Sequence, residues 1–194
     1  MTDYTDFATR IRTAGPLAWS EVISVISSVA PELDRLAAAG RQHGRVSPAA
    51  IATTADGAVV LLAAESLPGS PETGAHAAPE VFAGDAPNVA SDVFSLASTT
   101  FTLLTGMRPN PYGIAAVRQS RPDISPEVDA VLARAISRDP AFRYQSATAF
   151  AQALEAALSS GIPAPAEPAR PKPQRPRSAA RFGLRGHRRG GRGG

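Results

Sequence analysis

The segment His43-Gly44-Arg45-Val46-Ser47-Pro48 brings an imidazole, a guanidinium and a hydroxyl group close together in the chain. An imidazole can act as a general base toward a nearby nucleophile. That interpretation requires a nucleophile motif, and none accompanies His43. The three histidines, His43, His76 and His187, also lack the spacing of metal ligands, and the chain has no cysteine. We therefore expect no metal site, no disulfide and no cofactor.

The charge is divided unequally along the chain. Residues 1–160 contain 11 Arg, no Lys and 16 acidic residues, a net charge of −5. Residues 161–194 contain 8 Arg, one Lys and one Glu, a net charge of +8. The longest apolar run, residues 58–64, is too short to span a bilayer, and the polar, acidic start does not resemble a signal peptide. We expect a cytoplasmic protein with an acidic body (1–160) and a basic tail (161–194).

The first half of the body predicts one long helix followed by a hairpin. Apolar residues recur at spacings of three and four within residues 16–40, which predicts a helix that buries Val22, Ile26, Val29, Leu33 and Leu36. Pro31 lies inside this helix and should kink it or end it early. Residues 51–62 contain two apolar runs around Asp56-Gly57, a pair that favours a tight turn between two short strands.

The second half of the body predicts three more helices. Residues 64–79 are rich in Pro, Gly and Ser and indicate a loop. Residues 91–106 predict a buried helix that ends at its terminal glycine. Residues 125–137 begin with Ser and Pro, which favour a helix start. Residues 146–158 place Phe150, Leu154 and Leu158 on one face of the last predicted helix.

The tail has a different composition from the body. It begins with a Pro-rich stretch, which favours extended conformations, and ends in an Arg/Gly-rich stretch with few large apolar residues. Such a sequence cannot bury enough apolar surface to offset the entropy cost of ordering. We therefore expect residues 161–194 to be disordered.

Two long segments of the body match a known pattern. Residues 76–109 contain Ala-Pro-Glu followed by Ser-Asp-Val-Phe-Ser-Leu, and residues 125–154 contain Asp-Pro-Ala-Phe-Arg-Tyr. In their order and spacing they resemble the C-terminal lobe of bacterial Hanks-type serine/threonine protein kinases. The resemblance covers roughly residues 5–158. It implies a mainly α, kinase-like lobe with one small β-hairpin, and a start close to the hinge between lobes, so we expect no N-terminal lobe.

The resemblance implies structural roles for three charged residues. Glu80 matches the glutamate of Ala-Pro-Glu, which in the family pairs with a buried arginine, and Arg143 matches that arginine. Asp92 matches the aspartate that holds the backbone of the catalytic loop. A buried ion pair is costly to break from one side, because one charge is left without a partner.

The residues that carry phosphoryl transfer in the family are replaced. The family's catalytic loop reads His-Arg-Asp-x-Lys-Pro-x-Asn. Against it, Arg45 takes the place of the aspartate, Ser47 that of the lysine and Ala50 that of the asparagine, while Ala63 aligns with the aspartate of Asp-Phe-Gly. No Gly-rich phosphate loop precedes His43, and the body has no lysine. Phosphoryl transfer depends on such cations and metal ligands, so we expect no enzyme activity.

These observations favour a catalytically inactive kinase-like domain that binds protein partners or regulates kinase signalling. The partner would be a kinase, a phosphothreonine reader or a second copy of the chain. Thr73 and Ser178 are candidate phosphoacceptors. Two alternatives stay open. The basic tail could bind nucleic acid or an anionic membrane surface, mainly through its terminal arginines, or the chain could be a truncated remnant of a receptor-type kinase. The tail arginines concerned are Arg185, Arg188, Arg189 and Arg192.

Overall fold

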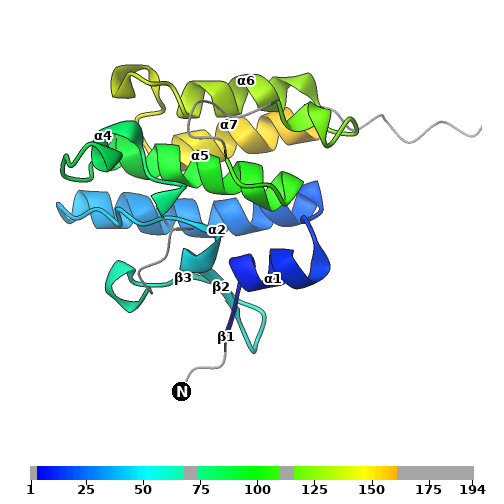
Figure 1. Cartoon of the computed structure of the whole chain (residues 1–194), viewed down its shortest axis with the longest axis horizontal. Helices are drawn as coiled ribbons and strands as arrows, with labels where there is room; N and C mark the ends of the chain where they lie inside the picture. The colour runs from blue at the N-terminus through cyan, green and yellow to red at the C-terminus, as the bar shows by residue number, and fades with distance from the viewer. Residues whose placement is uncertain (1–3, 68–73, 110–115, 161–194) are drawn as a thin grey trace, which may run out of the picture. The chain divides into compact units, whose positions relative to one another are not determined.

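Helices make up most of the computed structural model, which describes residues 4–67, 74–109 and 116–160 (Figure 1). A small three-stranded sheet lies at one side of them, next to the first helix. This arrangement matches the mainly helical, kinase-like lobe predicted from the sequence. The helices are α1 (Phe7–Ala14), α2 (Trp19–Ala38), α4 (Pro79–Phe82), α5 (Val89–Thr105), α6 (Pro126–Ala135) and α7 (Ala147–Ser160), and the strands are β1 (Tyr4–Asp6), β2 (Ile51–Thr54) and β3 (Val59–Leu61).

Helix α5 lies at the centre of the lobe and is buried nearly all round. It packs against α2, α6 and α7, and Figure 1 shows it between α2 on one side and α6 and α7 on the other. The side chain of Asn88 accepts a hydrogen bond from the Ser91 amide, and the Ser91 hydroxyl accepts one from the Asn88 amide, so the first turn is capped. The helix ends at Gly106, which has a φ of 72°. The predicted helix over 91–106 is therefore confirmed, and it begins two residues earlier.

Helix α2 is the longest element, and it continues through Pro31. Proline removes one backbone hydrogen bond, so the sequence predicted a kink or an early end. The early end is wrong, because Val29 and Ala30 before the proline and Leu33 after it are all buried in the core. Burial on both sides of Pro31 offsets the lost hydrogen bond.

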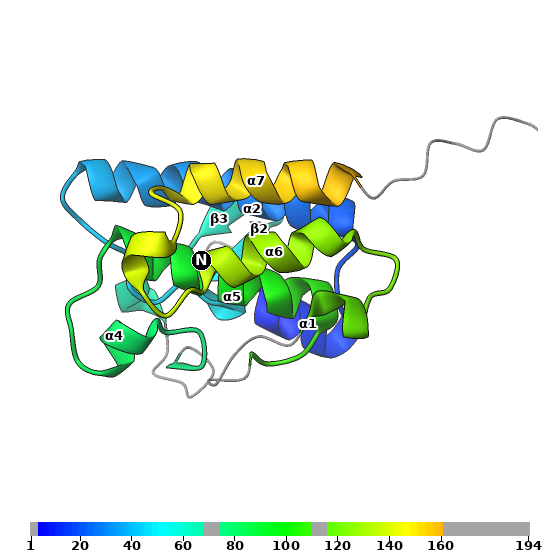
Figure 2. The same cartoon turned by 90° about the horizontal axis from the view of Figure 1, so that it is seen from above.

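Helices α2 and α7 lie side by side, and Figure 2 shows both along one edge of the molecule. The Asp34 carboxylate on α2 accepts hydrogen bonds from the amides of Ala147 (2.8 Å) and Thr148 (3.0 Å). These amides belong to the first turn of α7 and have no partner within their own helix. A side chain from a distant helix therefore caps α7, which the local sequence could not indicate.

The sheet is antiparallel, in the order β1-β2-β3. Strands β2 and β3 form the predicted hairpin around Asp56-Gly57, and Gly57 has a φ of 87°. Strand β1 was not predicted; it pairs with β2 so that Tyr4 faces Thr54. Its last residue, Asp6, then caps α1 by accepting a hydrogen bond from the Thr9 amide at 2.8 Å.

The two helices predicted near the end of the body are present. In α6 the Ser125 side chain accepts a hydrogen bond from the Glu127 amide, and Pro126 occupies the first helical position. In α7 the predicted apolar residues Phe150, Leu154 and Leu158 are buried in the same core cluster as Val128 and Leu132 of α6. None of the helices in the described ranges is long and apolar enough to cross a membrane.

Candidate functional site

The loop that contains His43 is held by a single carboxylate from the central helix. Asp92, in the first turn of α5, accepts hydrogen bonds from the amides of His43 and Gly44, each at 2.8 Å. Burial of this carboxylate raises the pKa of Asp92 above its ordinary value, and the two amide donors offset part of that increase. Asp92 therefore fixes the backbone of the loop, as the resemblance implied.

Gly44 is required by the shape of this loop. Its φ is +70°, a value that side chains with a Cβ rarely adopt. A Cβ at this position would also lie 2.7 Å from Cγ of Pro87. Glycine therefore stands where the family's pattern has an arginine, and this backbone leaves no room for a side chain there.

His43 uses both of its ring nitrogens within the protein. Its Nε2 lies 2.8 Å from the carbonyl oxygen of Leu62, and its Nδ1 accepts a hydrogen bond from the Arg45 amide at 3.2 Å. The bonding pattern therefore assigns the proton to Nε2, which donates to that carbonyl. The side chain is buried and joins the loop to the segment after β3. No ring nitrogen is left to act as a general base.

Arg45, which the sequence resemblance aligns with the family's catalytic aspartate, binds backbone carbonyl groups. Its Nη1 donates hydrogen bonds to the carbonyl oxygens of Ala64 (2.8 Å) and Leu67 (3.2 Å). These residues belong to the short 3₁₀ turn Ala64–Ser66 and the residue after it. A carboxylate has no proton to donate to these carbonyls. The guanidinium therefore gives the position a structural role that aspartate could not perform.

The side chains of Ser47, Ala50 and Ala63 offer no group that could bind a phosphate or a metal ion. Ser47 is 1% exposed, and its hydroxyl has no hydrogen-bond partner in the structure. Ala50 is fully buried, and Ala63 presents only a methyl group. Methyl groups have no lone pair for Mg²⁺, which binds carboxylate, carbonyl and water oxygens. The residues at these positions thus do not fit the magnesium site that the kinase pattern implies.

A small cavity of about 180 Å³ lies beside the loop, between the end of α2 and residues 61–65. Its wall includes Arg35, Arg41 and Glu65. Arg35 already binds Glu32 through two hydrogen bonds, of which the Nε bond is 2.8 Å long. Sites for small molecules typically measure about 300–1,000 Å³. This cavity is therefore smaller than a nucleotide site.

The buried side chain of Arg143 connects α4, α5 and the turn before α7 through hydrogen bonds. Arg143 is completely buried and donates to both carboxylate oxygens of Glu80, at 2.6 and 2.9 Å. It also donates to the carbonyl oxygens of Ala90 (3.0 Å) and Ser137 (2.8 Å), and its guanidinium lies 4.9 Å from the centre of the Phe94 ring. Burial alone would raise the pKa of Glu80, but the hydrogen bonds and charge of Arg143 outweigh this effect and lower it.

His76 is a buried titratable residue in the segment before α4. Its Nδ1 lies 3.0 Å from the hydroxyl of Ser98 on α5. Burial lowers the pKa of His76 to about 4, and the charge of Arg108 acts in the same direction. The histidine is therefore neutral at physiological pH and helps to hold this segment against α5. The sequence pattern around His76 indicated no structural role for this residue.

The structure brings Asp92 to the loop and pairs Glu80 with Arg143, so two clusters form on the two sides of the start of α5. The candidate phosphoacceptors Thr73 and Ser178 lie outside the described residues. The same holds for the tail arginines Arg185, Arg188, Arg189 and Arg192. No three His, Asp or Glu side chains gather into a possible metal site within residues 4–67, 74–109 and 116–160.

A helical lobe with a small sheet, a loop fixed by an aspartate of its central helix and a buried glutamate–arginine pair has the architecture of the large lobe of a protein kinase. No protein-family model matches the chain. PknD, a serine/threonine-protein kinase of Mycobacterium tuberculosis, is 29% identical over 187 residues, which cover 82% of this chain and 28% of PknD. PknI of Mycobacterium bovis is 32% identical over 143 residues, which cover 69% of this chain and 24% of PknI.

Solved structures give the same result. The crystal structure of the PknI kinase domain of Mycobacterium tuberculosis has a TM-score of 0.72 to this chain at 28% identity, and the match covers 84% of this chain and 64% of that domain. The chain is thus a relative of the mycobacterial serine/threonine protein kinases and corresponds to part of a kinase domain. It spans about a quarter of the length of the curated relatives named above.

Proposed function

We propose that this chain is a catalytically inactive kinase-like domain that acts as a protein-binding or regulatory module in kinase signalling. The observation that carries the proposal is the position of Arg45. It replaces the catalytic aspartate and uses its guanidinium to bind the carbonyl oxygens of Ala64 and Leu67. A cation that binds backbone cannot orient a substrate hydroxyl or accept its proton.

Three further features support the proposal. The hydroxyl of Ser47 is buried, so it cannot contact a phosphate as the family's lysine does. Ala50 and Ala63 cannot bind Mg²⁺. Gly44 has a positive φ and close contact with Pro87, so an arginine restored there would strain the backbone and clash with the Pro87 side chain. Several groups needed for phosphoryl transfer are thus exchanged together.

Two measurements test the absence of catalysis. Isothermal titration with Mg-ATP should give no heat of binding, and incubation with labelled ATP and a generic protein substrate should give no transferred label. The PknI kinase domain, treated in parallel, is the positive control. Label transfer by the full chain that persists in Arg45→Ala would contradict the proposal, because it would place catalysis on residues other than those of this loop.

A pull-down from native lysate tests the role in protein binding. The bait is the full chain, with nuclease-treated and untreated samples and a variant in which Arg185, Arg188, Arg189 and Arg192 are replaced by Ala. Capture of the same kinases or phosphothreonine-binding proteins by both baits, resistant to nuclease, supports a module that binds through its body. Capture that requires the tail arginines and is abolished by nuclease would contradict the proposal and indicate a nucleic-acid binder.

A further inference from the structure

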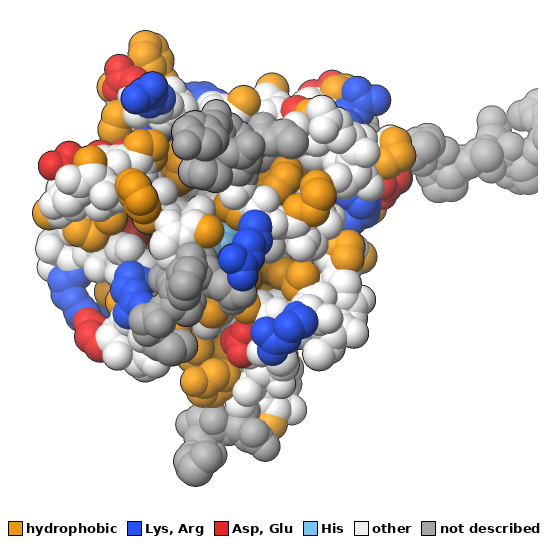
Figure 3. Space-filling view, viewed as in Figure 1, with side chains coloured by type: hydrophobic (Ala, Val, Ile, Leu, Met, Phe, Trp, Pro, Cys, Tyr) orange, Lys and Arg blue, Asp and Glu red, His pale blue; other side chains and the backbone are white. Residues whose placement is uncertain are grey.

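The cavity beside the His43 loop has an apolar part and a charged part. It measures about 180 Å³ and lies between the end of α2 and residues 61–65. The apolar part is formed by Leu36, Leu61 and Leu62, which are only partly buried. In Figure 3 basic and acidic side chains lie next to one another at the left edge of the view, where α2 ends in Figure 1. Leucine side chains at a cavity wall stay in contact with water until a ligand covers them.

The four charged residues that line the cavity differ in their partners. Glu32 and Arg35 bind each other through two hydrogen bonds, so each of these charges is already compensated. Arg41 and Glu65 are exposed, and within the described part of the chain their side chains form no hydrogen bond or ion pair. The cavity therefore offers one guanidinium and one carboxylate that are available to a ligand.

This pair of opposite charges selects a ligand that carries both signs. A guanidinium binds a carboxylate through two parallel hydrogen bonds, and a carboxylate binds an ammonium group through a charge-assisted one. A simple anion would be attracted by Arg41 and repelled by Glu65, and a simple cation would meet the reverse. A phosphate monoester would bring more than one negative charge close to Glu65. A molecule with one carboxylate, one ammonium group and a short aliphatic chain satisfies both charges and covers the leucines.

The volume of the cavity limits the size of this molecule. Sites for drug-sized ligands measure about 300–1,000 Å³, so the cavity admits only a smaller compound. We infer that it binds a free aliphatic α-amino acid. The carboxylate of the amino acid pairs with Arg41 and its ammonium group with Glu65, while its side chain packs against the leucines. This site goes beyond the proposed function, because it does not depend on the loss of phosphoryl transfer or on a protein partner.

A bound amino acid connects two segments of the lobe. Arg41 follows the end of α2, and Glu65 lies in the 3₁₀ turn Ala64–Ser66. The amides of Ser66 and Leu67 close this turn by donating to backbone carbonyl oxygens. A ligand that holds Glu65 should therefore slow the hydrogen exchange of these two amides, by about tenfold when its concentration is ten times its dissociation constant. This measurement reports binding at the cavity and not elsewhere on the chain.

Titration of the full chain with L-valine, followed by the amide chemical shifts in NMR spectra, tests the inference. A ligand of this size gains limited free energy per atom, so we expect a dissociation constant of about 1 mM. The shifts should concentrate in residues 41–43 and 61–66 and should saturate. N-acetylvaline lacks the positive charge and valinamide lacks the negative one, so each should bind at least tenfold more weakly. Glycine lacks the aliphatic side chain and should bind at least threefold more weakly.

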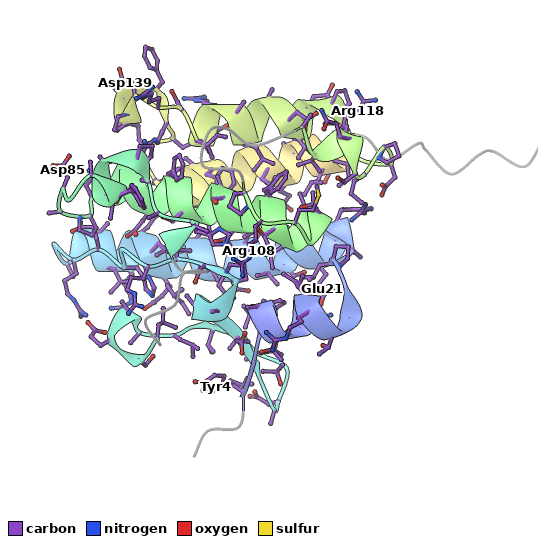
Figure 4. All side chains as sticks on the ribbon, in the orientation of Figure 1. Tyr4, Glu21, Asp85, Arg108, Arg118 and Asp139 are labelled. Carbon is purple, nitrogen blue, oxygen red and sulfur yellow. The ribbon has the colours of Figure 1, made fainter. Side chains whose placement is uncertain are left out.

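Two substitutions of exposed side chains locate the site. Arg41→Ala and Glu65→Gln should each weaken the binding of L-valine at least tenfold and abolish the valine-dependent slowing of exchange. Circular dichroism checks that both variants keep the fold. The matched controls are Arg118→Ala and Glu155→Gln, which remove an exposed charge of the same sign and should change the dissociation constant less than threefold. Figure 4 shows Arg118 at the opposite end of the molecule from the end of α2.

Three results would overturn the inference. The first is the absence of saturable shifts with L-valine up to about 20 mM, well above the expected dissociation constant. The second is binding of valinamide or N-acetylvaline as tight as that of valine, which would indicate a site for a single charge. The third is a dissociation constant that is unchanged in Arg41→Ala or Glu65→Gln, which would place the amino acid elsewhere on the chain.

Discussion

The two charged clusters beside the start of α5 differ in what they have kept. In the Arg143 cluster the glutamate and the arginine are those expected from the kinase resemblance, and they pair directly. In the loop around Arg45 the backbone anchor, Asp92, is of the expected type, while the residues at positions 45, 47 and 50 differ from the kinase pattern given above. The Arg143 cluster thus retains the side chains expected from the kinase resemblance. The loop retains the hydrogen bonds that fix its backbone.

The difference follows from what each cluster does physically. Arg143 is buried, so its replacement would leave the carboxylate of Glu80 without its partner, and we expect folding to depend on the pair. The loop needs two backbone amides to be bound, which Asp92 provides whatever side chains the loop carries. The fold therefore does not depend on which side chains stand at positions 45, 47 and 50 to the extent that it depends on Asp92. This comparison predicts that substitutions act on stability in the first cluster and only locally in the second.

The largest effect is expected for Arg143→Ala. It leaves the carboxylate of Glu80 and several carbonyl oxygens without their donor, and removal of one partner of a buried pair costs about 3–5 kcal/mol. Urea unfolding followed by circular dichroism measures the loss. The matched control is Arg134→Ala. Like Arg143, Arg134 has its guanidinium close to an aromatic ring, 4.4 Å from the centre of Tyr144, but Arg134 is exposed. A loss in Arg143→Ala no larger than that of the control would show that the pair does not hold the fold.

Asp92→Ala tests whether the anchor of the exchanged loop still stabilises the protein. It removes the acceptor of two amides, of which the His43 amide is in a buried bond. Each unsatisfied buried donor costs about 1–3 kcal/mol, so we expect a loss of about 2–4 kcal/mol in the free energy of unfolding. Asp92→Asn retains one acceptor oxygen and should lose about half as much. Equal losses in the two variants would mean that the charge, and not the hydrogen bonds, is the stabilising feature.

His76 connects the region before α4 to α5 and makes the stability depend on pH. Its pKa in the folded state is about 4, lowered from 6.5, so the unfolded chain binds more protons between these values. Stability therefore falls as the pH falls through this window, by about 2 kcal/mol between pH 8 and pH 5. His76→Gln should remove this slope in urea unfolding measured at several pH values. A slope that is unchanged in the variant would assign it to other groups.

Most of the helices could be predicted because their signals are local. The apolar spacing of residues 16–40, the Ser-Pro start at residue 125 and the glycine at residue 106 each specify one element by periodicity or capping. Strand β1 and the cap that Asp34 provides for α7 could not be predicted. A strand of three residues has too few positions to show a period, and Asp34 lies more than 100 residues from the amides it binds.

The candidate site was predictable only in part, for a similar reason. Aligned motifs indicated which residues are exchanged, but they could not indicate what a replacement binds. The contacts of Arg45 with Ala64 and Leu67, and the cavity that Arg41 and Glu65 line, depend on how distant segments pack. Sequence patterns therefore indicated which residue types differ from the kinase pattern, and the structure was needed to show what these residues contact.

The smallest effect on stability is expected for Arg45→Ala. Arg45 is partly exposed, so water can replace its hydrogen bonds to the carbonyls, and the loss should be about 1 kcal/mol. Its effect should be local. Hydrogen exchange of the Ser66 and Leu67 amides, which close the 3₁₀ turn, should become about fivefold faster, because 1 kcal/mol corresponds to that factor. Arg41→Ala, which removes an exposed arginine near the same loop, is the control and should leave this exchange unchanged.

Arg45→Asp tests the loop more directly. It restores the aspartate of the kinase pattern, while Asp92 still binds the backbone of the loop. A carboxylate cannot donate to the carbonyls of Ala64 and Leu67, so the exchange of this turn should be faster, as in Arg45→Ala. Label transfer from Mg-ATP should still be absent, because Ser47, Ala50 and Ala63 are unchanged. If Arg45→Asp alone gave label transfer, the loop would still position the other groups needed for phosphoryl transfer. The proposed inactivity of the wild type would then be due to Arg45 alone.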